Sequence, residues 1–149
     1  MKQRMSIDKV DPNALGAMMA LENYARQTTL EPALKELIKI RASQINSCAY
    51  CLEMHTADAR KLGESEARIY ALSAWRESPL FTEEERALLA ITEEITRLCE
   101  HGVSDETFER LKAKFDETTV AHIIMQVVVI NAWNRIAIAT RLQHAHQLK

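Results

Sequence analysis

The chain has 149 residues, 47% of them hydrophobic, which suits one domain with a buried core and is too little for two. We therefore expect residues 1–149 to form a single domain. The 19 basic and 21 acidic residues are spread along the sequence and give a net charge of −2. This balance disfavours nucleic acid and anionic membrane surfaces as partners.

The first eight residues lack the apolar segment of a signal peptide, and no continuous apolar run approaches the roughly 18 residues of a membrane span. We expect a cytoplasmic protein without a membrane segment. Three cysteines are too few for a secreted disulfide framework. In a reducing compartment, a CxxC pair is more often catalytic or metal-binding than structural.

The sequence predicts an all-α fold, because only 3 glycines and 3 prolines are present and apolar residues recur at intervals of three and four. Asp11 followed by Pro12 is typical of a helix start, and Gly63 is typical of a helix end. The first four helices are predicted from Pro12 to about Thr28, from Pro32 to the Asn46-Ser47 pair, from that pair to Gly63, and from Glu64 to Trp75.

Three further helices complete the prediction. The segment Thr82-Glu83-Glu84-Glu85 is a capping box that opens the fifth helix, which runs to about Cys99. A short helix follows from Asp105, and the longest begins after Asp116. This last helix is apolar on most sides, and few other helices are available to cover it. We therefore expect a compact domain of about six to seven helices that forms a homo-oligomer.

The third predicted helix carries the residues with the most chemistry. Cys48 and Cys51 are three residues apart, so their thiols lie on one helix face and can close into a disulfide. His55 follows Cys51 by one turn, which places a proton acceptor beside a thiol. Because Asn46-Ser47 is an N-cap signal, both cysteines fall in the first turn, where backbone N–H groups favour a thiolate.

The residues alone do not decide which of the two cysteines is the nucleophile. The helix dipole favours Cys48, which is nearer the helix start, whereas the four-residue offset to His55 favours Cys51. We favour Cys51 as the nucleophile, because proton abstraction needs hydrogen-bond reach or one bridging water.

Glu36 admits two interpretations. It lies twelve residues before Cys48, so an antiparallel helix pair could return its carboxylate to His55 and increase the basicity of the imidazole. Flanked by Lys35 and Lys39, it is more simply interpreted as a solvated surface residue.

Other interpretations of the cysteines are weaker. Free cysteines are often buried and inert, so the pair could serve only packing. The two thiols and the imidazole offer three zinc ligands, and Cys99 or His101 could supply a fourth. Structural zinc sites usually wrap the metal with a turn, whereas this spacing continues along a helix, so we expect no metal. Cys99 by itself is expected to be a packing residue.

Glu36, Cys48, Cys51 and His55 together match the pattern E-x11-C-x2-C-x3-H. On these residues the chain resembles the AhpD-like alkylhydroperoxidases of the carboxymuconolactone decarboxylase superfamily. Segments 37–46, 55–63 and 130–137 are also similar to members of this family, and the resemblance covers roughly residues 12–142. The chain departs from better-characterised members at Tyr50, where they have a second histidine, and we expect it to lack the longer N-terminal half that they carry.

The resemblance implies an AhpD-like helical fold, assembly as a trimer or hexamer, and thiol-dependent reduction of hydrogen peroxide or organic hydroperoxides. It implies that Cys51 is the peroxidatic cysteine, which passes through a sulfenic acid, and that Cys48 is the resolving partner. It also implies that His55 and Glu36 relay protons. Tyr50 is a possible accessory residue, able to donate a hydrogen bond but a poor proton acceptor near neutral pH.

The sequence has no nicotinamide or flavin signature, so we expect no bound cofactor. The electrons must then come from an external dithiol, either a lipoyl-type group or a thioredoxin-like partner. Two alternative functions stay open. A carboxymuconolactone decarboxylase-like lyase needs no reversible disulfide, so the paired thiols weigh against it. A non-catalytic redox sensor would use the disulfide to change oligomer packing.

Overall fold

The computed structural model describes residues 2–143, which form α-helices, one short 3-10 helix and connecting turns, with no strand in that range. The elements in chain order are α1 (Ile7–Val10), α2 (Pro12–Gln27), α3 (Pro32–Ile45), α4 (Ala49–Lys61), α5 (Glu66–Ala71), η1 (Leu72–Ala74), α6 (Glu83–Thr96), α7 (Leu98–His101), α8 (Asp105–Lys112) and α9 (Glu117–Thr140). The all-α prediction is confirmed. The expected number of helices was too low, because the short helices α1 and α7 carry no strong sequence signal.

Most predicted helix ends are confirmed by their capping contacts. The Asp11 side chain accepts hydrogen bonds from the first free N–H groups of α2, and Thr82 and Glu85 form the expected capping box at the start of α6. The predicted fifth helix, however, does not continue to Cys99. The backbone leaves helical geometry at Arg97, and a separate short helix, α7, follows.

The expectation that Cys99 packs in the core was wrong. Cys99 lies on α7, which has no buried residue, and its thiol is free and exposed. The apolar periodicity of α6 ends at the break before Leu98, which is itself 59% exposed.

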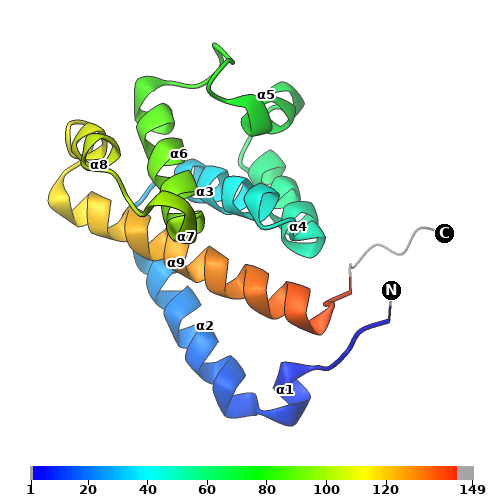
Figure 1. Cartoon of the computed structure of the whole chain (residues 1–149). Helices are drawn as coiled ribbons and strands as arrows, with labels where there is room; N and C mark the ends of the chain where they lie inside the picture. The colour runs from blue at the N-terminus through cyan, green and yellow to red at the C-terminus, as the bar shows by residue number, and fades with distance from the viewer. Residues whose placement is uncertain (1, 144–149) are drawn as a thin grey trace.

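Helix α9 forms the centre of the fold (Figure 1). In this view α2 lies below α9 and diverges from it toward α1, and α3, α4 and α6 lie above α9. The core is built from fully buried apolar side chains of α3, α6 and α9, which include Ile38, Ile40, Leu88, Ile91, Ile123, Val127 and Ile130.

Helix α9 is also long and apolar enough to cross a membrane, with a mean hydropathy of 1.4. Half of its most apolar window is buried inside the protein, and it packs against α2, α3, α4, α6 and α8. The core helix of a globular fold has these same properties, so α9 is weak evidence for a membrane segment. We expected no membrane segment from the sequence because it has no uninterrupted apolar run of sufficient length, and polar residues interrupt the apolar residues of α9 as well.

Helix α2 is the least covered of the long helices. Ala25 is its one buried residue, and α2 packs against α1 and α9. Met19 and Tyr24 are 38% and 48% exposed. This arm, helix α2, therefore presents apolar surface that the other described residues leave uncovered.

Candidate redox site

A tight turn between α3 and α4 positions the cysteine pair. The backbone N–H of Cys48 donates to the Ser43 carbonyl at 3.0 Å, and that of Ser47 donates to the Gln44 carbonyl at 3.2 Å. These two bonds form a Schellman motif, with Ser47 in the left-handed region at φ 58°. Cys48 becomes the N-cap of α4, so the helix starts slightly later than the Asn46-Ser47 signal predicts.

An asparagine network fixes this turn to α9. The Asn46 Nδ2 donates to Oδ1 of Asn131 at 2.9 Å and to Oδ1 of Asn134 at 2.8 Å. The Asn134 Nδ2 donates in turn to the Ser43 Oγ at 3.0 Å. Asn134 is fully buried, and a buried amide with satisfied donors holds its partners in one geometry.

Cys48 and Cys51 form a disulfide, with their Cα atoms 5.4 Å apart. The expectation that the pair can close is therefore met. The two residues are 1% and 2% exposed, and Ala137, Tyr50 and Leu142 pack around them. The Cys51 backbone N–H lies 3.4 Å from the Cys48 Sγ, so the first turn of α4 offers a hydrogen-bond donor to that sulfur.

Glu36 and His55 meet across the α3–α4 pair. The Glu36 Oε2 lies 3.0 Å from the His55 Nδ1, and the Glu36 Oε1 accepts a hydrogen bond from the Lys39 Nζ at 2.8 Å. The interpretation of Glu36 as a solvated residue was wrong, because the packing of α3 on α4 leaves Glu36 and His55 each 7% exposed.

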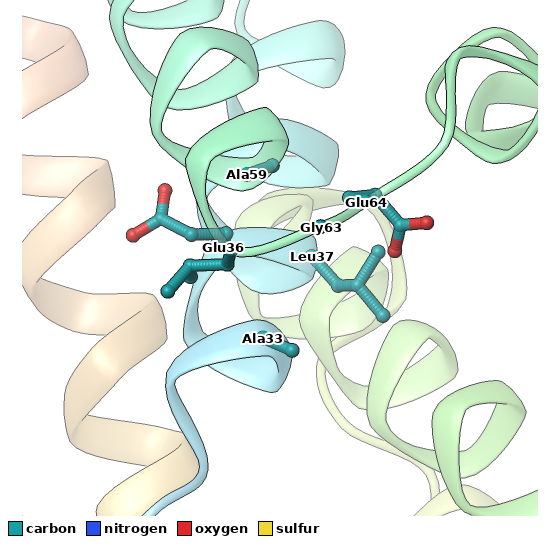
Figure 2. Close-up of a pocket in the computed structure, with 7 residues that line it drawn as sticks. Ala33, Glu36, Leu37, Ala59, Gly63 and Glu64 are labelled. Carbon is teal, nitrogen blue, oxygen red and sulfur yellow. The ribbon is translucent and has the colours of Figure 1, made fainter.

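Glu36 also borders a small cavity of about 140 Å³. This cavity is lined by residues of α3, of α4 and of the turn at Gly63. Figure 2 shows that the Glu36 carboxylate points away from Leu37 and Glu64. Gly63 itself ends α4 at φ 94°, as its position in the sequence predicts.

The Glu36 carboxylate fixes the protonation pattern of the pair. Burial raises the pKa of Glu36, but the hydrogen bond from His55 and the charge of Lys39 outweigh burial and hold that pKa below its usual value. An ionised carboxylate can only accept hydrogen bonds, so we assign the proton of a neutral imidazole to Nδ1. The Nε2 atom of His55 is then left as a proton acceptor.

A cavity of about 670 Å³ opens beside these groups. Cys51, His55, Glu36 and Tyr50 all line it, whereas Cys48 is not among its lining residues. The structure thus gathers the sequence-predicted residues around one space and gives Cys51 the direct access to it. A thiolate at Cys51 with an imidazole beside the same cavity can attack a peroxide or a disulfide.

The zinc interpretation lacks its donor set. Within residues 2–143, no three His, Cys, Asp or Glu side chains are grouped so that they could hold a metal ion. Cys99 and His101, the suggested fourth ligands, lie on the exposed helix α7.

The sequence did not indicate that α9 contributes the apolar wall of this cavity. Trp133 packs against the core, lines the cavity and donates from Nε1 to the Glu22 Oε2 at 3.0 Å. Gln126 and Leu142 line it as well. The one available signal was Gln126, a polar residue inside an otherwise apolar run.

The fold, the disulfide and the Glu36–His55 pair define an AhpD-like helical protein. A model of the carboxymuconolactone decarboxylase family matches residues 12–94, and the chain belongs to that family.

Relatives and solved structures agree with this assignment. The chain is 43% identical over 139 residues to the uncharacterized protein YdfG of Bacillus subtilis, covering 93% of this chain and 95% of YdfG. The crystal structure of ATU0492 from Agrobacterium tumefaciens is similar with a TM-score of 0.95 and 44% identity, covering 98% of this chain and all of that one. ATU0492 is a protein of unknown function whose name links it to the antioxidant defence protein AhpD.

The fold is shared more widely. The debrominase Bmp8 has a TM-score of 0.81 at 21% identity, covering 91% of this chain and 73% of Bmp8. At that identity the likeness concerns the fold alone.

Proposed function

We propose that this protein is a thiol-dependent peroxidase that reduces hydrogen peroxide or organic hydroperoxides through a dithiol/disulfide cycle at Cys48 and Cys51. The observation that carries the proposal is the shared cavity, which Cys51, His55 and Glu36 all line, with the His55–Glu36 contact at 3.0 Å. The link of ATU0492 to antioxidant defence supports the same class of activity.

The proposed cycle begins with the reduced pair. His55, oriented by Glu36, takes the proton of the Cys51 thiol, and the thiolate attacks the terminal oxygen of the hydroperoxide. The O–O bond breaks, the alcohol or water leaves with a proton returned through His55, and Cys51 becomes a sulfenic acid. The Cys48 thiol then attacks this sulfur, water leaves, and the Cys48–Cys51 disulfide forms.

An external dithiol of the lipoyl or thioredoxin-like type completes the cycle, and the chain needs no bound cofactor of its own. Attack of that dithiol on Cys51 would release Cys48, whose sulfur lies 3.4 Å from the Cys51 backbone N–H. That donor stabilises the departing Cys48 thiolate, and a stabilised thiolate leaves faster.

Steady-state peroxide consumption with dihydrolipoamide or reduced thioredoxin tests the proposal. We expect one dithiol oxidised per peroxide reduced, and loss of turnover in both Cys51→Ser and Cys48→Ser, with Cys99→Ser unchanged as the control. If oxidation changes the sedimentation of the protein but turnover is negligible, the redox-sensor function replaces the peroxidase. Full activity of Cys48→Ser on a carboxylated lactone would instead favour the lyase.

A further inference from the structure

Among the polar side chains that line the large cavity, Gln126 has a buried donor without a partner, and the proposed reaction does not use it. Gln126 on α9 lines the cavity and is 1% exposed. Its Nε2 is buried and has no hydrogen-bond acceptor among the described residues. Buried donors in native proteins are nearly always paired, so an orphaned one beside a cavity points to an acceptor that arrives with a ligand.

Gln126 lies at the far end of the cavity from the disulfide. Ala137 packs on the cysteine pair, and Gln126 precedes it by eleven residues of the same helix. That separation is about 16 Å along a helix axis. The cavity wall between these two positions is apolar and comes from α9, with Ile130, Trp133 and Ile136. Hydrogen peroxide would leave most of this space unfilled, since cavities of roughly 300–1,000 Å³ suit drug-sized ligands.

The Gln126 end of the cavity also carries a lysine. Helix α3 starts beside the start of α9, where the Thr29 Oγ1 lies 3.4 Å from the His122 Nδ1, and Ser43 near its other end meets Asn134. Lys35, early in α3, therefore lies toward the Gln126 end. Its Nζ donates to the backbone carbonyls of Arg26 and Thr28 rather than to a carboxylate.

The charged groups around the cavity are compatible with binding of an anion. Glu36 pairs with Lys39 and Asp58 with Lys61, whereas Glu22 accepts the Trp133 indole hydrogen bond and its charge only partly offsets the lowering of the Lys35 pKa. Burial and the neighbouring charge of Lys39 lower the pKa of Lys35. A carboxylate beside Lys35 would offset both effects and would accept the hydrogen bond that the Gln126 Nε2 lacks.

We propose that this cavity binds a long-chain fatty acid hydroperoxide, with its carboxylate held by the Gln126 Nε2 and Lys35, its hydrocarbon chain along the α9 wall, and its hydroperoxide group at Cys51. The binding part of this inference is independent of catalysis, whereas the reaction of the bound hydroperoxide rests on the proposed peroxidase function. The reaction itself is unchanged: the O–O bond is reduced and a hydroxy fatty acid leaves.

Calorimetric titration of the oxidised protein with linoleic acid and with its methyl ester tests the binding. We expect the acid to bind at least tenfold more tightly than the ester, and Gln126→Leu and Lys35→Met each to weaken acid binding by about tenfold. Gln27→Leu makes the same chemical change at an exposed position of α2 and should bind like the wild type. Equal affinity for acid and ester, or unchanged binding in Gln126→Leu, would overturn the proposal.

Stability separates a binding role from a structural one. Because the Nε2 is unpaired in the free protein, Gln126→Leu should keep or raise the melting temperature while it weakens binding. In turnover, Gln126→Leu should raise the KM for linoleic acid hydroperoxide about tenfold and leave tert-butyl hydroperoxide unaffected. A lowered melting temperature with equal loss on both peroxides would assign Gln126 to the fold and contradict the proposal.

The two proposals fail in different ways. Linoleate binding that depends on Gln126, without consumption of any peroxide, would reject the peroxidase and keep the fatty acid site. Turnover of tert-butyl hydroperoxide with no preference for the fatty acid over its ester would reject the fatty acid site and keep the peroxidase.

Discussion

At the level of single residues, Glu36 is the buried charge that orients His55 in the redox site. Two lysines flank it in the sequence, yet its carboxylate is buried between the Lys39 Nζ and the His55 Nδ1. Flanking charges predict an exposed carboxylate, because most carboxylates are solvated. They do not show which other helix packs over that carboxylate in the fold. The antiparallel arrangement of α3 and α4 was informative, because it returns His55, nineteen residues later, to Glu36.

Glu36→Gln should destabilise the protein at neutral pH by about 1–3 kcal/mol, because it removes charge-assisted hydrogen bonds to two partners in a buried site. Chemical denaturation measures this difference. Glu109→Gln is the matched control, since it breaks an exposed i,i+3 pair with Lys112 and should change stability by well under about 1 kcal/mol.

The stability difference between the wild type and Glu36→Gln should depend on pH. The folded-state pKa of Glu36 is lowered from its ordinary value of 4.5, so its ionised form stabilises the fold fully above that pH. This contribution is lost as the pH falls through the lowered folded-state pKa. The difference in stability between wild type and Glu36→Gln should therefore shrink as the pH falls below 4.5. A difference that stays constant into strong acid would show that the ionised carboxylate is not what stabilises the site.

At the scale of elements, the α3–α4 turn decides the geometry of the redox site. Helix positions and most caps followed from Pro12, Pro32, Gly63 and the box at Thr82, which act locally. The asparagine network that ties the turn to α9 could not be predicted. Its two hydrogen bonds join residues that are separated in the sequence by 85 and by 88 positions. The N-cap of α4 is Cys48 and not Ser47, because Ser47 has the left-handed backbone conformation that ends α3.

Asn134→Leu should destabilise the protein by about 1–3 kcal/mol, because it leaves the Ser43 hydroxyl and one Asn46 bond without a partner in a buried site. Urea denaturation gives this value, and disulfide formation should slow as the turn loosens. Asn13→Leu, at an exposed position near the start of α2, is the comparison. Equal stability of Asn134→Leu and wild type would mean that packing alone holds the turn.

Ser47→Gly should stabilise the fold by about 1 kcal/mol, because glycine adopts the left-handed conformation without the steric penalty of a Cβ atom. The expected result is a higher melting temperature for both the reduced and the oxidised protein. A lower melting temperature would indicate that the hydroxyl of Ser47 has a stabilising contact that outweighs the backbone penalty.

At the scale of the whole molecule, the sequence predicted the helical class and the apolar character of α9 but not how the helices cover it. Half of the most apolar part of α9 is buried within the chain, and α2 packs against α9 with a single buried residue of its own. Periodicity shows which residues of a helix are apolar, but not whether its own chain or a second copy covers them. We propose that copies of this chain associate through the α2 arm.

Sedimentation velocity tests this association. The wild type should sediment as a trimer or hexamer of the 17.0 kDa chain, and a Met19→Glu/Tyr24→Glu variant should shift toward the monomer. Because both side chains are already exposed in the single chain, its helical content should not change. Lys114→Glu introduces the same charge elsewhere and should assemble normally. A monomeric wild type would contradict the proposed association.

The proposed cycle requires that Cys51 reacts with peroxide and that Cys48 then attacks the Cys51 sulfenic acid. Its most direct measurement is mass spectrometry of the reduced proteins after one equivalent of peroxide, with dimedone present to trap sulfenic acid. We expect a disulfide in the wild type, a dimedone adduct on Cys51 in Cys48→Ser, and no adduct on Cys48 in Cys51→Ser. An adduct that forms on Cys48 in Cys51→Ser, with none on Cys51 in Cys48→Ser, would contradict it.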